Sequence, residues 1–356
     1  MKATRLKQLL SILWTPLLFM FGIFTLSLFM NSNTGVRRPL FQPITPKAAP
    51  SASPILEYVT RSTNQMMPTT RHPLIPPYPY EYRFILNEPD KCRREAPFLV
   101  IMIIVDSKDS AARHSIRSTW GNESSIPGVS MARIFLTGIS PKLTNEIQTM
   151  LQEESVTFKD IIQQDFLDTY NNLTLKTIMG MEWVAKYCPQ ASYVMKIDSD
   201  MFLNVDFLVH KLLRPELPVR SNYMSGYIVS NTGPLRSKAY KWYVPKEVYP
   251  KDKYPPYCAG PGYVFSGDLA KKIYDVAQTI QLINMEDSFI GICMDELKIS
   301  LTEPPPSVFN GHKIEYNRCW FSSLITVHHY SPQQLLEIWP DFQSRNDSEC
   351  IAKKGR

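Results

Sequence analysis

The chain has 356 residues and a formal net charge of +6, with 44% hydrophobic and 20% charged residues. This length allows one large domain with appendages, or two small domains. Basic residues are scattered rather than massed, which argues against a nucleic-acid-binding protein and makes a small anionic substrate the better fit.

The N-terminal segment 9–30 contains no charged residue and follows Lys2, Arg5 and Lys7. It is long enough to cross a bilayer as a helix. A cleaved signal peptide is the alternative, but the run exceeds a usual signal core and no clear cleavage site follows it. We therefore predict a cytoplasmic tail (1–8) and an uncleaved anchor (9–30), with the rest of the chain luminal because basic residues are in excess before the span.

Residues 31–93 are rich in proline and show no sustained hydrophobic period, which predicts an extended or disordered stem before a packed domain at 94–356. All six cysteines follow the anchor, and an even count suits the oxidising secretory lumen. They form no CxxC pair, so zinc is not expected, and fifteen pairings stay open. Glycosylation sequons at Asn122, Asn172 and Asn346 also suit a luminal domain.

The packed domain begins with alternating strand and helix patterns. Apolar, β-rich runs predict buried strands at 98–105, 132–138 and 193–197. Helices are expected at 111–120, 142–154 and 205–213, and segment 165–177 leads into a further long helix that runs to about Tyr187. This order predicts an α/β fold with a doubly wound sheet flanked by helices.

Arg113 and Arg117 are four residues apart and share a face of the helix that follows the first strand. Open α/β sheets bind ligands at the carboxyl ends of their strands, so these guanidinium groups could hold a diphosphate. Surface salt bridges are the alternative.

Asp198-Ser199-Asp200 follows the apolar run at 193–197. If the strand persists to Asp200, both carboxylates point to the same side. Mg²⁺ and Mn²⁺ prefer carboxylate and phosphate oxygens, so the pair predicts a site for a metal and a nucleotide. The alternative is a polar strand end with two solvated acids.

Segment 223–257 is rich in aromatic residues, among them Trp242 and Tyr257. Aromatic faces beside polar groups suit sugar stacking, although ordinary packing can also explain them. The following segment, 258–267, predicts a glycine-bearing turn into a strand, where Gly260 and Gly262 would let the backbone approach a ligand or fold tightly.

Two later features carry candidate polar groups. Glu286-Asp287 precedes an apolar helix and could supply a general base or an N-cap. His328-His329 lies at the end of a strand, before a helix at 333–339. A histidine there is either structural or, if it faces the aspartates, a third metal ligand.

The motifs, taken in order, resemble the β-1,3-galactosyltransferase and β-1,3-N-acetylglucosaminyltransferase family of Golgi enzymes. The resemblance covers about residues 94–340. The matching motifs are Arg113-x-x-Ile116-Arg117-x-Thr119-Trp120, Asp168-x-Tyr170-x-Asn172-Leu173-Thr174-x-Lys176-Thr177, Lys196-Ile197-Asp198-Ser199-Asp200-Met201-Phe202, Tyr254-Pro255-Pro256-Tyr257-Cys258-Ala259-Gly260-x-Gly262-Tyr263-Val264, Glu286-Asp287-x-x-x-Gly291-x-Cys293, and His328 before Pro332. Serine between the aspartates makes the chain more similar to the galactosyltransferase members.

This resemblance implies a GT-A fold with a Rossmann-type mixed sheet, and a single-pass type II protein of the Golgi membrane. It implies UDP-galactose as donor, Mn²⁺ or Mg²⁺ as cofactor, and inverting β1,3 transfer to an N-acetylglucosamine-terminated glycan of a glycoprotein or glycolipid. Two alternatives stay open: UDP-N-acetylglucosamine as donor, and a non-catalytic, membrane-tethered glycan-binding protein.

The resemblance also implies residue roles. Asp200 corresponds to the principal metal ligand, His328 to an additional one, and Asp198 to a contact with the ribose or the metal's water shell. Asp287 corresponds to the base that takes the acceptor proton, and Arg113 and Arg117 to nucleotide contacts. The candidate sugar contacts are Glu286, Trp242, Tyr257, Gly260 and Gly262. Two positions depart from the family pattern without removing a reacting group: Ser288, where Val is usual, and Ile197, where Thr is common.

Overall fold

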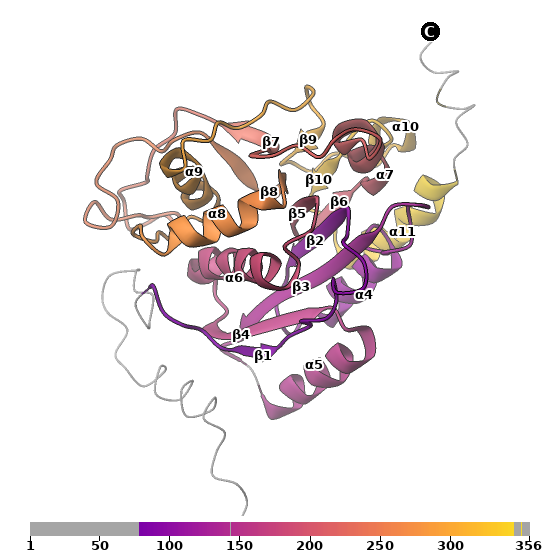
Figure 1. Cartoon of the computed structure of the whole chain (residues 1–356), viewed down its shortest axis with the longest axis horizontal. Coiled ribbons are helices and arrows are strands. Elements are labelled where there is room, and N and C mark those ends of the chain that lie inside the picture. The colour runs from indigo at the N-terminus through magenta and orange to yellow at the C-terminus, as the bar shows by residue number, and fades with distance from the viewer. Residues whose placement is uncertain (1–77, 143, 345–349, 351–356) are drawn as a thin grey trace, which may run out of the picture. The chain divides into compact units, whose positions relative to one another are not determined.

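The structure of the protein, a computed structural model, describes residues 78–142, 144–344 and 350. Its main element is a seven-stranded sheet in the order β1-β4-β3-β2-β5-β8-β7 (Figure 1). The strands are Phe84–Leu86 (β1), Leu99–Ile104 (β2), Met131–Ile139 (β3), Ile161–Leu167 (β4), Tyr193–Asp198 (β5), Met224–Val229 (β7) and Tyr257–Ser266 (β8). Strands β4, β3, β2 and β5 are parallel, whereas β1 and β8 are antiparallel to their neighbours. The predicted mixed α/β sheet is confirmed.

Helices cover both faces of this sheet (Figure 1). They are Ser110–Ser118 (α4), Asn145–Phe158 (α5), Leu173–Tyr187 (α6), Asp268–Ala277 (α8), Glu286–Glu296 (α9) and Pro332–Gln343 (α11). Alternate residues of β2 enter two cores, because successive strand residues point to opposite faces. Val100 and Met102 pack in the core that includes α6, α8 and α9, and Ile101 and Ile103 in the core that includes α4, α5 and α11. Burial on both faces explains the uninterrupted apolar run of this strand.

The strand order reverses between β2 and β5. The chain first builds β2, β3 and β4 outward in one direction and then places β5 on the other side of β2. In open α/β sheets, ligands bind outside the carboxyl ends of the strands at such a reversal. Ile104 at the end of β2 pairs with Asp198 at the end of β5, so Asp198 lies at this point.

A smaller sheet brings the C-terminal histidines to the same region. It comprises Met201–Leu203 (β6), Thr326–His328 (β10) and Phe309–Asn310 (β9), in the order β6-β10-β9. Strands β6 and β10 are antiparallel, and His328 lies opposite Met201. The shorter helical elements are Tyr170–Asn172 (η1), Val205–Phe207 (α7), the π-helix Leu208–Leu213 (η2) and Arg318–Phe321 (α10).

The folded domain begins earlier than the sequence predicted. Strand β1, within the predicted stem, pairs antiparallel with β4, and a disulfide joins Cys92 to Cys188. Trp183 also donates a hydrogen bond from Nε1 to Asn87 Oδ1 (3.0 Å). The predicted boundary at residue 94 is therefore wrong. A three-residue edge strand among prolines is too short to show a hydrophobic period.

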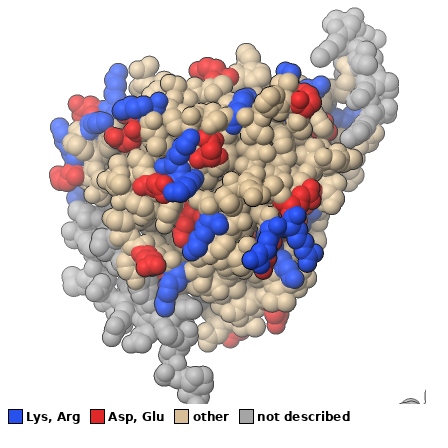
Figure 2. Space-filling view, in the orientation of Figure 1, with Lys and Arg blue, Asp and Glu red and all other residues tan. Residues whose placement is uncertain are grey.

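Four cysteines form disulfides, Cys92–Cys188 and Cys319–Cys350, which agrees with the predicted oxidising environment. Cys258 and Cys293 are buried free thiols. Among the described residues on the face seen in Figure 2, basic and acidic side chains are interspersed. The surface charge on this face is therefore mixed.

No helix within the described parts of the chain is both long and apolar enough to span a membrane. The predicted cytoplasmic tail and anchor lie outside the described residues. So do the stem up to residue 77 and the sequon asparagine Asn346.

Candidate active site

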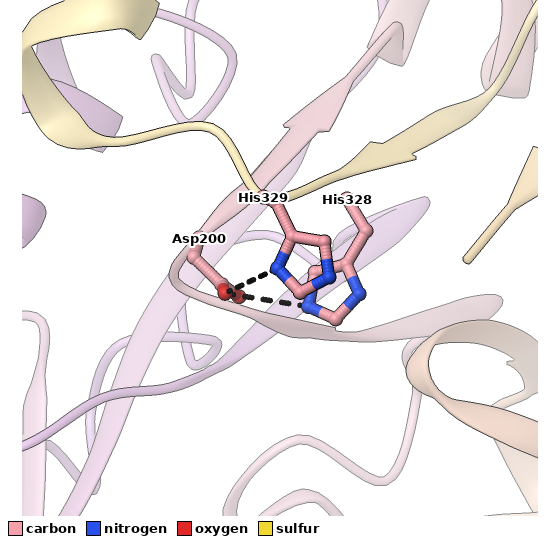
Figure 3. Close-up of side chains that lie close together, drawn as sticks. All are labelled: Asp200, His328 and His329. Carbon is pink, nitrogen blue, oxygen red and sulfur yellow. Dashed lines mark ion pairs between the residues drawn. The ribbon is translucent and has the colours of Figure 1, made fainter. Parts of the chain in front are cut away.

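Asp200 faces two histidines where the two sheets meet. Strand β5 ends at Asp198, and residues 199–200 form a turn before β6. The strand does not persist to Asp200, so Asp198 and Asp200 do not share one strand face as predicted. Instead, Asp200 Oδ2 lies 3.3 Å from His328 Nε2 and 3.8 Å from His329 Nδ1 (Figure 3).

The two histidine rings lie on the same side of the chain. Consecutive residues of a regular strand point to opposite faces, so only one of them was expected to meet the aspartates. His329 has a φ of +66°, which ends the alternation after β10. The rings stack with centroids 3.8 Å apart and an interplanar angle of 14°. His329 is thus a third candidate ligand that the sequence did not single out.

The donor atoms of Asp200, His328 and His329 fit a cation. They all lie within 4.8 Å of one another. His328 Nδ1 lies 3.2 Å from the Gly311 carbonyl oxygen, so a proton on Nδ1 leaves the Nε2 lone pair facing the Asp200 carboxylate. Metal-bound histidines commonly donate their other N–H to a carbonyl in this way. Burial lowers the pKa of His328, but the Asp200 carboxylate outweighs burial and raises it, so the site attracts positive charge.

Asp198 belongs to a different group, centred on a buried lysine. The ammonium group of Lys196, whose side chain is only 4% exposed, lies 2.7 Å from Asp198 Oδ1 and 2.5 Å from the Gly260 carbonyl oxygen. Glu286 Oε2 is 3.5 Å away, and Glu286 also accepts a hydrogen bond from Tyr263 Oη (2.7 Å). Lys196 therefore compensates part of the negative charge of two carboxylates. Glu286 is buried and engaged by Lys196 and Tyr263, so it is poorly placed for a sugar contact.

Asp287 is the accessible carboxylate of the acidic pair. It is half-buried, and its oxygens accept hydrogen bonds from the backbone N–H groups of Ser288 (2.7 Å) and Gly260 (3.3 Å). The N-cap of α9 is Met285, so the alternative of an acidic N-cap is wrong. Because Asp287 lies in the first turn of α9, the helix dipole stabilises its negative charge. This carboxylate can accept a proton from a bound hydroxyl group.

The glycines at 260 and 262 lie within β8, not in a turn. Strand β8 is continuous because it pairs with both β5 and β7. A Cβ on Gly260 would lie 3.4 Å from Glu286 Oε2 and 3.6 Å from Asp287 Oδ2, so Gly260 adjoins the acidic pair. Gly262 is buried, and a Cβ there would lie 3.2 Å from Met195 Cε. Its role is close packing, and the expected sugar contact at Gly262 is not supported.

The two aromatic candidates differ in accessibility. Trp242 is 43% exposed, and its Nε1 donates a hydrogen bond to Tyr170 Oη (2.8 Å). Tyr257 is half-buried at the start of β8, and its hydroxyl accepts a hydrogen bond from Thr232 Oγ1 (3.3 Å). Trp242 therefore offers the more open surface for a sugar.

Residues 111–305 match the family model described as galactosyltransferase. The chain belongs to the galactosyltransferase family. Residues 56–100 also match a model described as beta-1,3-galactosyltransferase 2 N-terminus.

Relatives of this galactosyltransferase family member include beta-1,3-galactosyltransferase 2 of Mus musculus and of Homo sapiens. Each is 48% identical over 275 residues, which is 77% of this chain and 65% of the relative. Beta-1,3-galactosyltransferase 1 of Mus musculus is 43% identical over 272 residues, covering 76% of this chain and 82% of the relative. The match thus spans less than two-thirds of the length of the type 2 relatives. Among solved structures, the galactosyltransferase LgtC in complex with donor and acceptor sugar analogs is similar to this chain. The match covers 70% of this chain and 98% of the LgtC chain. LgtC is 10% identical to this chain, with a TM-score of 0.36.

The paired arginines of this family member lie in a buried ion-pair network. Arg113 is 2% exposed and donates to both oxygens of Glu154 (2.6 and 2.8 Å) and to two backbone carbonyls after β2. Arg117 donates to Asp160 (2.7 and 2.9 Å) and to Glu154 (2.6 Å). The two guanidinium groups do share a helix face. Their N–H groups, however, already donate hydrogen bonds to carboxylates and backbone carbonyls. The expected nucleotide contacts of Arg113 and Arg117 are therefore not supported.

We expect the substitution Asp160→Asn to lower the free energy of unfolding by about 3–5 kcal/mol at pH 7, because it leaves buried arginine charge uncompensated. Asp160 is fully buried and pairs with Arg117 and Arg133. Burial raises the pKa of Asp160, but the two arginines outweigh burial and lower it below its ordinary 3.8. The stabilisation is therefore complete above that value and is lost as pH falls through the lower, folded-state pKa.

Chemical denaturation at pH 7 and near pH 3 measures this difference. Asp275→Asn is the matched control, because Asp275 pairs with Lys271 at the surface. Exposed pairs of this kind contribute only about 0–1 kcal/mol. Equal losses of stability in the two variants at pH 7 would contradict the role of Asp160.

Two of the three sequons can be compared with the structure. Asn122 is exposed, and its side-chain oxygen accepts a hydrogen bond from the Ser124 N–H (3.1 Å). Asn172 is only 9% exposed, and its Nδ2 donates to the Leu167 carbonyl oxygen (2.7 Å). The predicted glycosylation of Asn172 conflicts with this burial, because the amide nitrogen that would carry the glycan supports the start of α6.

Proposed function

We propose that the chain is an inverting, metal-dependent β-1,3-galactosyltransferase. It moves galactose from UDP-galactose to the 3-hydroxyl of a terminal β-N-acetylglucosamine on glycoprotein or glycolipid glycans. The main support is that a cation-binding group, Asp200 with two histidines, and a separate accessible carboxylate, Asp287, lie close to the strand-order reversal. Hydrogen bonds through Lys196 and Gly260 connect Asp287 to Asp198, which lies two residues before Asp200. The names of the relatives support the choice of donor sugar and linkage.

We propose that Asp200, His328 and His329 hold a divalent cation. Two imidazoles and one carboxylate suit a transition metal such as Mn²⁺ better than Mg²⁺, which prefers oxygen ligands. When bound, the cation would neutralise the charge of the departing diphosphate as a Lewis acid. Asp198 would contact the ribose or the metal's water shell through Oδ2, because Lys196 engages Oδ1.

Asp287 would accept the proton of the acceptor hydroxyl group. An inverting transfer needs the acceptor oxygen on the face of the sugar opposite to the leaving diphosphate. The base must therefore be separate from the cation site. Glu286 is excluded from this role by its burial and its partners, whereas Asp287 is both held in place and accessible.

We further propose that this is a single-pass type II protein of the Golgi membrane, with residues 1–8 cytoplasmic, 9–30 as the anchor and the folded domain luminal. The uncharged segment supports the anchor. Two disulfides and an exposed sequon at Asn122 support the luminal location of the domain.

UDP release by the full-length protein in detergent micelles tests the proposed function. UDP-galactose and UDP-N-acetylglucosamine are compared as donors, with and without an N-acetylglucosamine-terminated acceptor and with and without Mn²⁺. We expect release to be fastest with UDP-galactose, acceptor and Mn²⁺ together. A preference for UDP-N-acetylglucosamine would assign the alternative donor. Absence of release with every donor would favour a non-catalytic glycan-binding protein.

A further inference from the structure

An exposed aromatic pair and a lysine meet beside the acidic site. Tyr170 and Trp242 are 45% and 43% exposed, and they are joined by the hydrogen bond between Trp242 Nε1 and Tyr170 Oη. The ammonium group of Lys241 lies 5.2 Å from the Tyr170 ring centroid and 4.8 Å from that of Trp242. We call these three side chains the aromatic platform. They come from segments about 70 residues apart and are held in contact although their rings remain open to solvent.

Tyr170 is held by the polar residues around it. Asp168 pairs with the buried Lys176 (2.7 Å), and Asn172 donates to the Leu167 carbonyl oxygen (2.7 Å). These residues belong to the motif from Asp168 to Thr177, which had no assigned role. Their side chains fix the backbone around η1, whereas the Tyr170 ring faces outward. These contacts therefore hold the backbone that carries the Tyr170 ring.

Trp242 and Lys241 lie on a loop that hydrogen bonds hold together. Arg236 donates three hydrogen bonds of 2.8 Å across this loop, to the backbone carbonyls of Val244, Tyr249 and Lys251. Val244 itself is fully buried. The loop thus presents its exposed side chains from a fixed backbone.

One short segment supports both sides of the platform and the helix of the proposed base. Thr174, at the start of α6, donates to the Ile283 carbonyl oxygen (2.7 Å). Asn284 donates to the Tyr243 carbonyl oxygen, next to Trp242 (3.3 Å). Segment 283–284 then leads directly into α9, which carries Asp287. The platform is therefore connected to α9, the helix that carries the proposed base.

The electrostatics place Tyr170 near the same carboxylates. Burial raises the pKa of the Tyr170 hydroxyl and the hydrogen bond from Trp242 lowers it, while the charges of Asp287 and Asp198 contribute to the net increase. Tyr170 therefore lies within the electrostatic range of both acids.

We propose that Tyr170, Lys241 and Trp242 form the acceptor-binding surface, on which the apolar face of a sugar ring stacks while its reactive hydroxyl points toward Asp287. This inference rests on the proposed transferase function. Aromatic rings with an apolar face and a polar group suit a sugar, which offers C–H groups and hydroxyls together. Lys241 adds three N–H donors for acceptor oxygens. The donor nucleotide is assigned elsewhere, to the cation site.

Steady-state kinetics of the full-length protein test the platform with UDP-galactose and an N-acetylglucosamine-terminated acceptor. We expect Tyr170→Ala and Trp242→Ala each to raise the acceptor KM by about tenfold, the loss expected when an aromatic contact is removed. The KM for UDP-galactose should change much less. Tyr170→Phe keeps the ring and should restore most of the acceptor affinity. Trp320→Ala on α10 is the control, since Trp320 is another half-exposed tryptophan.

Calorimetric binding of the same acceptor, with UDP and Mn²⁺ present, separates this inference from the proposed function. If the wild type binds the glycan through the platform but transfers no galactose, the proposed function fails and the platform stands. If both alanine variants keep the wild-type acceptor affinity, or lose donor affinity equally, the platform is overturned. Thermal unfolding of each variant shows whether it is folded, and Tyr170→Phe provides the comparison if an alanine variant is not.

Discussion

Asp287→Asn is expected to reduce galactose transfer by about 10²- to 10⁴-fold, the contribution typical of general-base assistance. Asparagine keeps the size of the side chain but cannot accept the proton of the acceptor hydroxyl group. The affinity for UDP should change little, because Asp287 is not one of the three residues of the candidate cation site. The UDP-release assay measures the turnover number, and calorimetry measures the affinity for UDP. Together they show whether Asp287 acts in proton transfer without contributing to UDP binding.

Asp295→Asn provides the matched control, because Asp295 is an exposed aspartate on the same helix, α9. It removes the same charge from the helix without touching the acidic pair. Turnover of Asp287→Asn at the wild-type level would rule out Asp287 as the base. Equal loss in both variants would point to a general effect of helix charge.

Asp200→Ala is expected to abolish most of the Mn²⁺-dependent part of UDP binding. Mutations of groups that only support metal ligands already cost about 10- to 100-fold in metal affinity, so loss of a ligand should cost at least as much. Calorimetric titration of UDP with and without Mn²⁺ measures the effect. UDP binding in the absence of the metal should be much less affected.

Asp206→Ala is the control for this titration. Asp206 also faces a histidine, His210, at 3.8 Å, but this pair lies on the surface and belongs to no group of three candidate metal ligands among the described residues. We expect wild-type, metal-dependent binding in this variant. Unchanged Mn²⁺-dependent affinity in Asp200→Ala would exclude Asp200 as a principal ligand.

The sheet was largely predictable because burial of strands on both faces leaves a direct mark on the sequence. The apolar runs that became β2, β3 and β5, and the C-terminal end of the helix that became α6, were placed within one or two residues. Strand β8 was partly misread, because its glycines are typical of turns. Within the sheet, Gly262 is needed for close approach to Met195 instead. Glycine alone does not distinguish the two cases.

The site was less predictable because its geometry depends on single backbone angles and on distant partners. Asp198 and Asp200 were expected on one strand face, but a turn separates them, and a positive φ at His329 brings a second imidazole to Asp200. The i,i+4 spacing of Arg113 and Arg117 correctly predicted that they share a helix face. Their carboxylate partners, however, lie 37 to 43 residues further along the chain, where no local pattern reveals them.

The attachment of β1 to the sheet limits how the chain can be shortened. A fragment beginning at residue 94 would lack the strand that covers β4 and the cysteine that pairs with Cys188. Uncovered strand edges pair with other molecules, and an unpaired thiol can form intermolecular disulfides. Such a fragment would be prone to aggregation for reasons unrelated to catalysis. A soluble fragment of the folded domain for crystallisation should therefore start before β1.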